Sequence, residues 1–132
     1  MKIAVPLAAA ILLTGMAPAT AGTPQAATLD HFQKLAGTPA SPERGKTLFE
    51  AEHTGGKPQT RSCTACHGKA PSKSGKTRAG KIILPMALSQ TPDRYADLAK
   101  VEKWFRRNCN NVLGRACTAQ EKSDFLAFMM SQ

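Results

Sequence analysis

Five consecutive residues, Cys63-Thr64-Ala65-Cys66-His67, narrow the possible folds of this chain more than any other stretch. Two cysteines separated by two residues, with histidine immediately after, make the spacing at which a c-type haem is attached. The thiols add to the vinyl groups of the porphyrin, and the imidazole of His67 is held beneath the iron, which it can ligate in both oxidation states. The motif occurs once. The sequence therefore predicts one covalent haem c, bound through Cys63 and Cys66, with His67 as proximal iron ligand.

Other uses of a Cys-x-x-Cys pair fit less well. A thioredoxin-like dithiol lies near a βαβ pattern, which this sequence lacks. A zinc site needs about four well-spread ligands, and His67 directly after Cys66 is poorly spaced for that geometry. A third alternative is an exported binding protein without haem that is held by two disulfides.

The first residues have the pattern of an export signal. Lys2 provides a short positive region, the stretch 3–16 is almost wholly apolar, and Ala19-Thr20-Ala21 is a small-residue cleavage site. An uncleaved membrane anchor is the alternative, but the apolar run is shorter than the roughly 20 residues that a span needs. We expect residues 1–21 to be removed as a signal peptide, leaving one soluble, periplasmic cytochrome c domain over 22–132.

The mature chain would be strongly basic. Without Lys2 it has 17 Lys and Arg against 9 Asp and Glu, a formal charge of +8. Such a charge favours acidic partners, and export argues against nucleic acid, so an acidic redox protein is the expected partner. Several cations lie in a predicted loop over 68–80, which is either simply solvated or forms a basic docking rim around an exposed haem edge. These cations are Lys69, Lys73, Lys76 and Arg78.

The spacing of apolar residues predicts helices and no sustained strand alternation, so the expected fold is all-α. After a flexible lead-in over 22–27, Thr28 is expected to cap a short helix that ends at Gly37. Ser41-Pro42-Glu43 predicts a second helix start, with a capping hydroxyl, proline at the first position and an acid facing the helix dipole. The apolar positions expected on these two helices are Leu29, Phe32, Leu35, Leu48 and Phe49.

Two further helices are predicted in the second half of the chain. Thr91-Pro92-Asp93 repeats the helix-start signal, and the helix that follows is expected to stop at Gly114. Its apolar stripe is Leu98, Val101, Phe105 and Val112, and Asn108 falls on that stripe. Thr118-Ala119-Gln120-Glu121 is a capping box that opens the last helix, with apolar positions Phe125, Leu126, Phe128 and Met129.

The ligand on the other side of the iron decides function, and spacing leaves several candidates. A methionine there makes a low-spin electron carrier, and Met86 is the main methionine candidate. Met86 follows His67 closely, however, and methionine more often lines a pocket. Asn108 either binds the iron or bonds local backbone at the helix end, since an unpaired buried amide is costly. The other candidates more often lie at the surface or in the core: His31, His53, Met129 and Met130.

Cys109 and Cys117 remain once the haem motif has taken two of the four cysteines. An oxidising compartment favours a disulfide between them over two free thiols. Such a bridge would close a loop of nine residues and stabilise the fold by roughly 2.5 kcal/mol on the loop-entropy model. It would also hold the end of the helix that carries Asn108.

Several motifs together resemble the sphaeroides haem protein family, and more distantly cytochrome c double-prime. They are Thr54-Gly55-Gly56-Lys57-Pro58, Ser62-Cys63-Thr64, Cys66-His67-Gly68, Thr91-Pro92-Asp93-Arg94, Val101-Glu102-Lys103-Trp104, Arg107-Asn108-Cys109-Asn110, Gly114-Arg115 and Cys117-Thr118. The resemblance implies a class I cytochrome c-like fold with Asn108 as a displaceable sixth ligand and a Cys109–Cys117 disulfide. In the double-prime relatives, histidine takes the place of the asparagine. The sequence departs from the family at Met86, where leucine is usual, and at Leu88, where proline is usual.

The resemblance also sets functional expectations. It implies that reduction releases Asn108, so that ferrous haem takes dioxygen, nitric oxide or carbon monoxide. Met86 and Trp104 are expected to line the pocket, and the alternative for Met86, a departure from the family, is that it competes for the iron. Because an amide oxygen is a hard, weak donor, it suits ferric better than ferrous iron. Electrons would come from a dihaem cytochrome c or a membrane cytochrome b, and turnover of oxygen with nitric oxide is chemically feasible. The alternative is a conventional electron-transfer cytochrome c with Met86 as sixth ligand.

Overall fold

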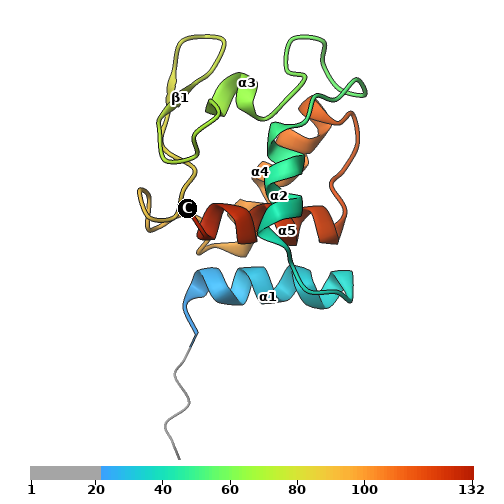
Figure 1. The fold of residues 1–132 in the computed structure, drawn as a ribbon, viewed down its shortest axis with the longest axis vertical. Coiled ribbons are helices and arrows are strands. Elements are labelled where there is room, and N and C mark those ends of the chain that lie inside the picture. Colours follow the sequence, from blue (N-terminus) through green and yellow to red (C-terminus); the bar gives the residue numbers. More distant parts are fainter. Residues whose placement is uncertain (1–21) are drawn as a thin grey trace, which may run out of the picture.

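The computed structural model describes residues 22–132, so the predicted signal peptide 1–21 lies outside the described residues. In this range five helices and two very short strands follow one another. Figure 1 shows their arrangement. They are α1 (Pro24–Ala36), α2 (Pro42–Glu50), α3 (Thr64–His67), β1 (Gly75–Lys76), β2 (Ile82–Ile83), α4 (Leu98–Val112) and α5 (Ala119–Met130). The all-α expectation is confirmed, except that β1 and β2 form a minimal antiparallel pair with Gly75 opposite Ile83.

Helix α5 lies at the centre of the packing. It contacts both α1, which runs alongside it in Figure 1, and α2, which crosses it. A helix with neighbours on two sides needs buried residues around much of its circumference. Accordingly, α5 buries Leu126 towards one core cluster and Phe128 and Met129 towards another.

The two clusters divide the core between them. The first is built on edge-to-face rings, with the centroid of Phe105 lying 5.8 Å from Phe32 and 5.6 Å from Phe125. Its buried members are Phe32, Val101, Phe105, Cys109 and Leu126. The second consists of Phe49, Met86, Phe128 and Met129, and Cys63 packs against it. The second cluster therefore links the core to the predicted haem-attachment motif.

Two of the predicted helix starts are confirmed. The Ser41 hydroxyl accepts a hydrogen bond from Arg44 N at the start of α2. At the start of α5, Thr118 Oγ1 accepts from Glu121 N, and the Glu121 carboxylate accepts from Thr118 N at 2.8 Å. These caps stabilise helix ends by satisfying N–H groups that have no partner within the helix.

The predicted start of the first helix is wrong. Helix α1 begins at Pro24, and Thr23 is its cap, so the expected flexible lead-in is largely helical. Thr28 lies inside α1, where its hydroxyl donates to Pro24 O at 3.1 Å. The end at Gly37 is confirmed, since this glycine has a φ of 70° and closes the helix. Leu35, expected on the apolar face, is 64% exposed.

The start of α4 is also later than predicted. Thr91-Pro92-Asp93 begins a turn instead of a helix, and Asp97 caps α4 by accepting from Lys100 N at 3.0 Å. Tyr95 interrupts the helical path with a φ of 66°. This left-handed conformation is unusual for a residue other than glycine, and it persists only where neighbouring contacts hold it.

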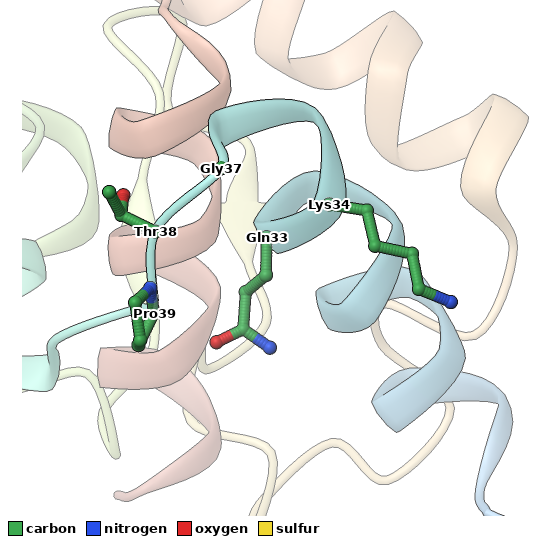
Figure 2. A pocket seen from close by; sticks show the side chains of 5 residues that line it. All are labelled: Gln33, Lys34, Gly37, Thr38 and Pro39. Carbon is green, nitrogen blue, oxygen red and sulfur yellow. The ribbon is translucent and has the colours of Figure 1, made fainter.

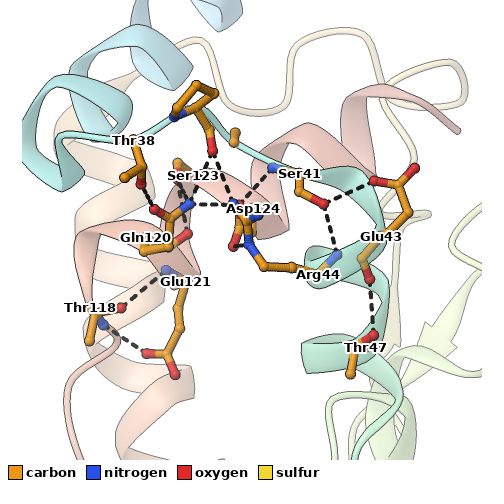
Figure 3. A network of polar contacts seen from close by, with 12 residues as sticks. Thr38, Ser41, Glu43, Arg44, Thr47, Thr118, Gln120, Glu121, Ser123 and Asp124 are labelled. Atoms are coloured by element: carbon orange, nitrogen blue, oxygen red, sulfur yellow. Dashed lines mark hydrogen bonds and ion pairs between the residues drawn. The ribbon is translucent and has the colours of Figure 1, made fainter.

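A buried carboxylate joins α2 to α5. Asp124 is 4% exposed and accepts from Ser41 N at 2.7 Å, from Arg44 Nε at 2.7 Å and Nη2 at 2.8 Å, and from Gln120 Nε2 at 2.8 Å. Figure 3 shows these side chains converging from the two helices. Nearby, Gly45 lies so close to α5 that a Cβ there would overlap the Asp124 carbonyl oxygen. Together these contacts fix the crossing of α2 over α5.

None of the helices within residues 22–132 combines the length and the apolar character needed to cross a bilayer.

Candidate haem site

Helix α3 presents the residues of the predicted attachment motif on one face. His67 N donates to Cys63 O at 3.1 Å, which closes a single helical turn. Cys63, Cys66 and His67 are therefore at positions i, i+3 and i+4, which share a helix face. Ser62 supports this turn because its hydroxyl accepts from Ala65 N at 3.2 Å.

The strand β1 lies directly against α3. At Gly75, a Cβ would overlap the carbonyl oxygen of Cys66 and the Cα of His67. Glycine allows a close approach of two backbones that no other residue permits. The contact packs the hairpin against the end of α3, at Cys66 and His67.

The environment of His67 is suited to a metal ligand. Its Nδ1 atom is buried and has no hydrogen-bond partner among the described residues. Burial, with a smaller contribution from the Arg94 guanidinium, lowers the pKa of His67 to about 4. The imidazole is therefore neutral near pH 7, which is the form that binds a metal. An unpaired buried nitrogen is costly in a protein alone, so its presence fits a site completed by a cofactor.

The two cysteines of the motif are unpaired in the structure. Burial raises the pKa of the Cys63 thiol to about 11, and the neighbouring Cys66 contributes to this rise. Catalytic dithiols have lowered pKa values, so this environment is unlike a thioredoxin-type site. Cys63 instead packs on the apolar cluster of Phe49, Met86 and Phe128, which suits a thioether to a large apolar group. Within residues 22–132 no three His, Cys, Asp or Glu side chains gather as a metal ion would require.

Hydrogen bonds to its main-chain groups hold the segment 84–87 to two other parts of the chain. Met86 N and Ala87 N both donate to Pro71 O, at 2.8 and 3.0 Å. From the other side, Arg94 Nε donates to Pro85 O at 2.7 Å, and Tyr95 Oη donates to Met86 O at 2.7 Å. Tyr95, whose backbone φ is 66°, thus contributes its hydroxyl to this segment.

Met86 is 7% exposed and forms part of the second core cluster with Phe49, Phe128 and Met129. Its side chain is thereby engaged in packing, and its backbone is fixed as described above. Met86 thus belongs to the cluster against which Cys63 packs, a position suited to lining a cofactor pocket.

Helix α4 carries the other predicted pocket residues. Its buried stripe is Val101, Phe105, Cys109 and Val112, so the apolar stripe passes through Cys109 and leaves Asn108 half-buried beside it. The prediction that Asn108 lies on the stripe is therefore wrong by one residue. Trp104 precedes Asn108 by one turn, is 44% exposed, and has the Arg107 guanidinium 5.5 Å from its ring centroid. In the part of the chain that the structure describes, the Asn108 amide hydrogen-bonds no other residue.

The end of α4 is fastened covalently and by close backbone packing. A disulfide joins Cys109 to Cys117, whose Cα atoms are 5.6 Å apart. Gly55 and Gly56 press against the last carbonyl groups of the helix, and Gly114, with a φ of 71°, touches Gly55. These contacts leave little freedom for the helical turn that bears Asn108.

The other candidate ligands have ordinary structural roles. His31 lies edge-on to Phe32, with 5.2 Å between ring centroids, and His53 Nε2 is 3.4 Å from Leu48 O. Met129 is fully buried in the core, and Met130 is half-buried at the end of α5.

An open hollow of about 390 Å³ lies where α1 joins α2, and it offers no comparable chemistry. Figure 2 shows that Gln33 and Lys34 leave the last turn of α1 in different directions. Gln33 Oε1 accepts from Ala40 N at 2.8 Å, and Lys34 pairs with Asp30. Thr38, the third polar side chain that lines the hollow, donates to Gln120 Oε1, so all three are engaged in holding the local structure.

The predicted loop over 68–80 is mostly exposed, apart from buried Pro71 and half-buried Gly75 and Thr77. Its cations are solvent-facing, and none forms an ion pair within the described chain: Lys69, Lys73, Lys76 and Arg78. The apolar side chains of Ile82 and Leu84, 57% and 60% exposed, follow this basic segment directly.

Sequence reasoning missed the residues that hold the segment 84–87. The side chains of Arg94 and Tyr95 donate to main-chain carbonyl groups nine or ten residues away. No local sequence pattern predicts such contacts. Gly75 was also missed. A glycine in a basic loop is ordinary, and only its contact with α3 shows that it is needed there.

Comparisons with known proteins agree with the geometry. Residues 35–129 match a family described as a domain of unknown function, DUF1924. Cytochrome c-type protein SHP from Cereibacter sphaeroides is 53% identical over 116 residues, covering 87% of this chain and 90% of that protein. Cytochrome c″ from Methylophilus methylotrophus is 33% identical over 89 residues, covering 67% of this chain and 62% of that protein.

Two solved structures extend the likeness to the fold. Oxidised SHP, described as an oxygen-binding cytochrome c, matches with a TM-score of 0.81 and 51% identity, over 85% of this chain and 100% of that one. Oxidised cytochrome c″ from Methylophilus methylotrophus matches with a TM-score of 0.72 and 27% identity, over 83% of this chain and 94% of that one.

Proposed function

Since this chain belongs to the family of c-type cytochromes that includes SHP, we propose that it is a periplasmic, redox-active monohaem cytochrome that binds a diatomic gas. Its cofactor is covalently bound haem c, as in these relatives. The observation that carries the proposal is the identity of 53% to SHP, whose solved structure is that of an oxygen-binding cytochrome c.

In this proposal the chain's residues divide the work of holding the cofactor. Cys63 and Cys66 form the two thioether bonds, and neutral His67 is the permanent iron ligand. Haem iron, when bound, supplies a one-electron redox couple and a coordination position for a small gas. Met86 and Trp104 line the pocket and limit the access of water.

Asn108 is the proposed displaceable ligand. Its amide has no partner within the described residues, and the core stripe of α4 passes beside it through Cys109, which leaves the amide free to act. An amide oxygen is a hard, neutral donor that favours ferric over ferrous iron, so reduction weakens its hold. Once released, the same amide can donate a hydrogen bond to a gas in the pocket.

Met86 as a sixth ligand is the less favoured alternative. Its backbone N–H donates to Pro71 O and its carbonyl oxygen accepts from Tyr95 Oη, and its side chain is buried among Phe49, Phe128 and Met129. Binding iron would require the side chain to leave that cluster. Burying a methionine side chain stabilises a fold by about 1.5–3 kcal/mol, which such a movement would forfeit in part.

The test is a set of absorption spectra of ferric, ferrous and carbon monoxide-treated holoprotein, for the wild type and for Asn108→Ala. We expect carbon monoxide to change the ferrous wild-type spectrum and Asn108→Ala to change the ferric spectrum. Asn110→Ala is the matched control, because Asn110 is exposed on the same helix, and its spectra should equal those of the wild type. A ferric spectrum unaffected by Asn108→Ala would exclude this residue as a ligand. A methionine-to-iron charge-transfer band would identify Met86 instead.

We further propose that electrons arrive from an acidic redox protein, either a dihaem cytochrome c or a membrane cytochrome b, that docks on the basic loop. The four unpaired cations of residues 68–80 and the exposed Ile82 and Leu84 support this proposal. Docking by charge predicts a rate of reduction that falls steeply with ionic strength. Replacing Lys73 and Lys76 by Gln should make the rate of reduction less sensitive to ionic strength. Replacing Lys34, which lies on α1 outside the basic loop, by Gln should leave that sensitivity unchanged.

A further inference from the structure

A second cavity, lined by none of the residues assigned to the haem, lies in the segment between α2 and α3. It has a volume of about 280 Å³ and is lined by His53, Thr54, Gly56, Lys57, Pro58 and Arg61. Three of these six residues are basic and none is acidic. This volume is near the lower end of the range for ligand pockets, so it suits a small molecule with a few waters.

The charges at this cavity have no internal counter-ion. Neither Lys57 nor Arg61 forms an ion pair within residues 22–132. The acidic residues nearest in sequence, Glu50 and Glu52, do not line the cavity. In addition, the backbone N–H groups of Thr54 and Gly56 donate to no backbone carbonyl of the described chain. Uncompensated cations beside open N–H donors form the kind of environment that binds anions.

The segment that lines the cavity is held in one conformation. His53 N donates to Arg61 O at 2.6 Å, which ties its two ends together. Lys57 N and Thr60 Oγ1 both donate to Asn111 O, at 2.8 and 3.1 Å, which fastens its middle to the end of α4. Since Lys57 and Arg61 project from a segment that is already ordered, binding a ligand there costs little additional backbone entropy.

We propose that this cavity is a binding site for a small inorganic oxyanion, taken from solution and held by Lys57 and Arg61. Arginine matches the paired oxygens of such an anion, and lysine adds a point charge. The site uses no residue of the proposed haem site. Its existence therefore does not depend on the identity of the iron ligands, and either proposal can fail alone.

Calorimetric titration of the holoprotein with inorganic phosphate, at an ionic strength held constant with chloride, tests the proposal. We expect saturable binding of phosphate by the wild type. Replacing both Lys57 and Arg61 by Gln should weaken it about tenfold, and each single replacement about threefold. Replacing Lys69 and Arg78 by Gln removes the same charge outside the cavity and should change the affinity less than about twofold. Thermal melts should show that every variant is folded, because all four side chains are exposed.

Three results would overturn the proposal. The first is an absence of saturable phosphate binding by the wild type. The second is an equal loss of affinity in the two double variants, which would mean that only overall charge matters. The third is binding to the haem-free chain but not to the holoprotein, which would mean that the carboxylates of the haem itself occupy the cavity.

Discussion

Replacing Asp124 by Asn tests how the crossing of α2 over α5 is held. The carboxylate accepts four hydrogen bonds of 2.7–2.8 Å, two of them from the Arg44 guanidinium. An amide of the same shape has one acceptor oxygen, and its NH₂ group would face donors. Three of the bonds end on Oδ1 and one, from Arg44 Nε, ends on Oδ2, so an amide in its best orientation keeps three bonds, loses that one and turns its NH₂ group towards Arg44 Nε. Asp124 is only 4% exposed, so little water can replace the lost bond.

The expected cost follows from these contacts. A hydrogen bond to a charged group contributes about 1.5–3 kcal/mol, so losing one and leaving the other three on a neutral acceptor should cost about 3 kcal/mol at pH 7. For a domain of this size that corresponds to a fall in Tm of about 12 °C. Urea denaturation and thermal melts followed by circular dichroism would measure both quantities.

The effect should also depend on pH in a definite direction. Burial of the Asp124 carboxyl tends to raise its pKa, but the hydrogen bonds from Arg44, Ser41 and Gln120 outweigh it, and the pKa is lower than usual. A carboxyl whose pKa is depressed by folding stabilises the fold fully above its unfolded pKa of about 3.9. That stabilisation is lost as the pH falls through the folded pKa. The difference between wild type and Asp124→Asn should therefore shrink below about pH 4.

The matched control is Asp93→Asn, which removes an equal charge from an exposed carboxyl with no hydrogen-bond or ion-pair partner in the described chain. It should leave the stability at pH 7 nearly unchanged. Equal losses in the two variants, or a loss at Asp124 that stays constant down to pH 3, would refute the reasoning.

Three further changes have expected outcomes. Gly75→Ala should reduce the yield of haem-loaded protein several-fold, measured by Soret absorbance per chain, because its Cβ would overlap Cys66 O; Ser74→Ala, next to it and exposed, should not. Replacing both Cys109 and Cys117 by Ser should lower the free energy of unfolding by about 2.5 kcal/mol in urea, and reductant should then have no further effect on the variant. Met86→Leu conserves volume, so it should cost less than about 1.5 kcal/mol and leave the ferric spectrum unchanged; a changed spectrum would place Met86 on the iron.

Helix starts that depend only on residues close together in the sequence could be predicted from it. Ser41 and Thr118 cap α2 and α5 as expected, because a cap needs only a hydroxyl and an N–H three residues later. Thr91-Pro92-Asp93 carries nearly the same signal as Ser41-Pro42-Glu43, yet no helix begins there. Bonds from Arg94 and Tyr95 to the segment 84–87 hold it as a turn, and such contacts exist only in the folded chain.

In the candidate site, too, features set by local sequence could be predicted and features set by tertiary contacts could not. The spacing of Cys63, Cys66 and His67 predicts their common face on α3, because one helical turn determines it. The position of Asn108 could not be obtained in this way. A stripe drawn at helical spacing includes either Asn108 or its neighbour Cys109, and the packing of Cys109 against Phe105 and Leu126 decides between them.

The contact between Gly55 and Gly114 limits how this protein can vary. A side chain at either position would overlap main-chain atoms of the other segment. A second substitution can replace a bulky side chain by a smaller one, but it cannot remove main-chain atoms. A replacement at one glycine therefore has no simple compensating replacement at the other. Natural variants should either retain both glycines or change the two segments at Gly55 and Gly114 by insertion or deletion. Variants that replace a single glycine in segments of unchanged length are not expected.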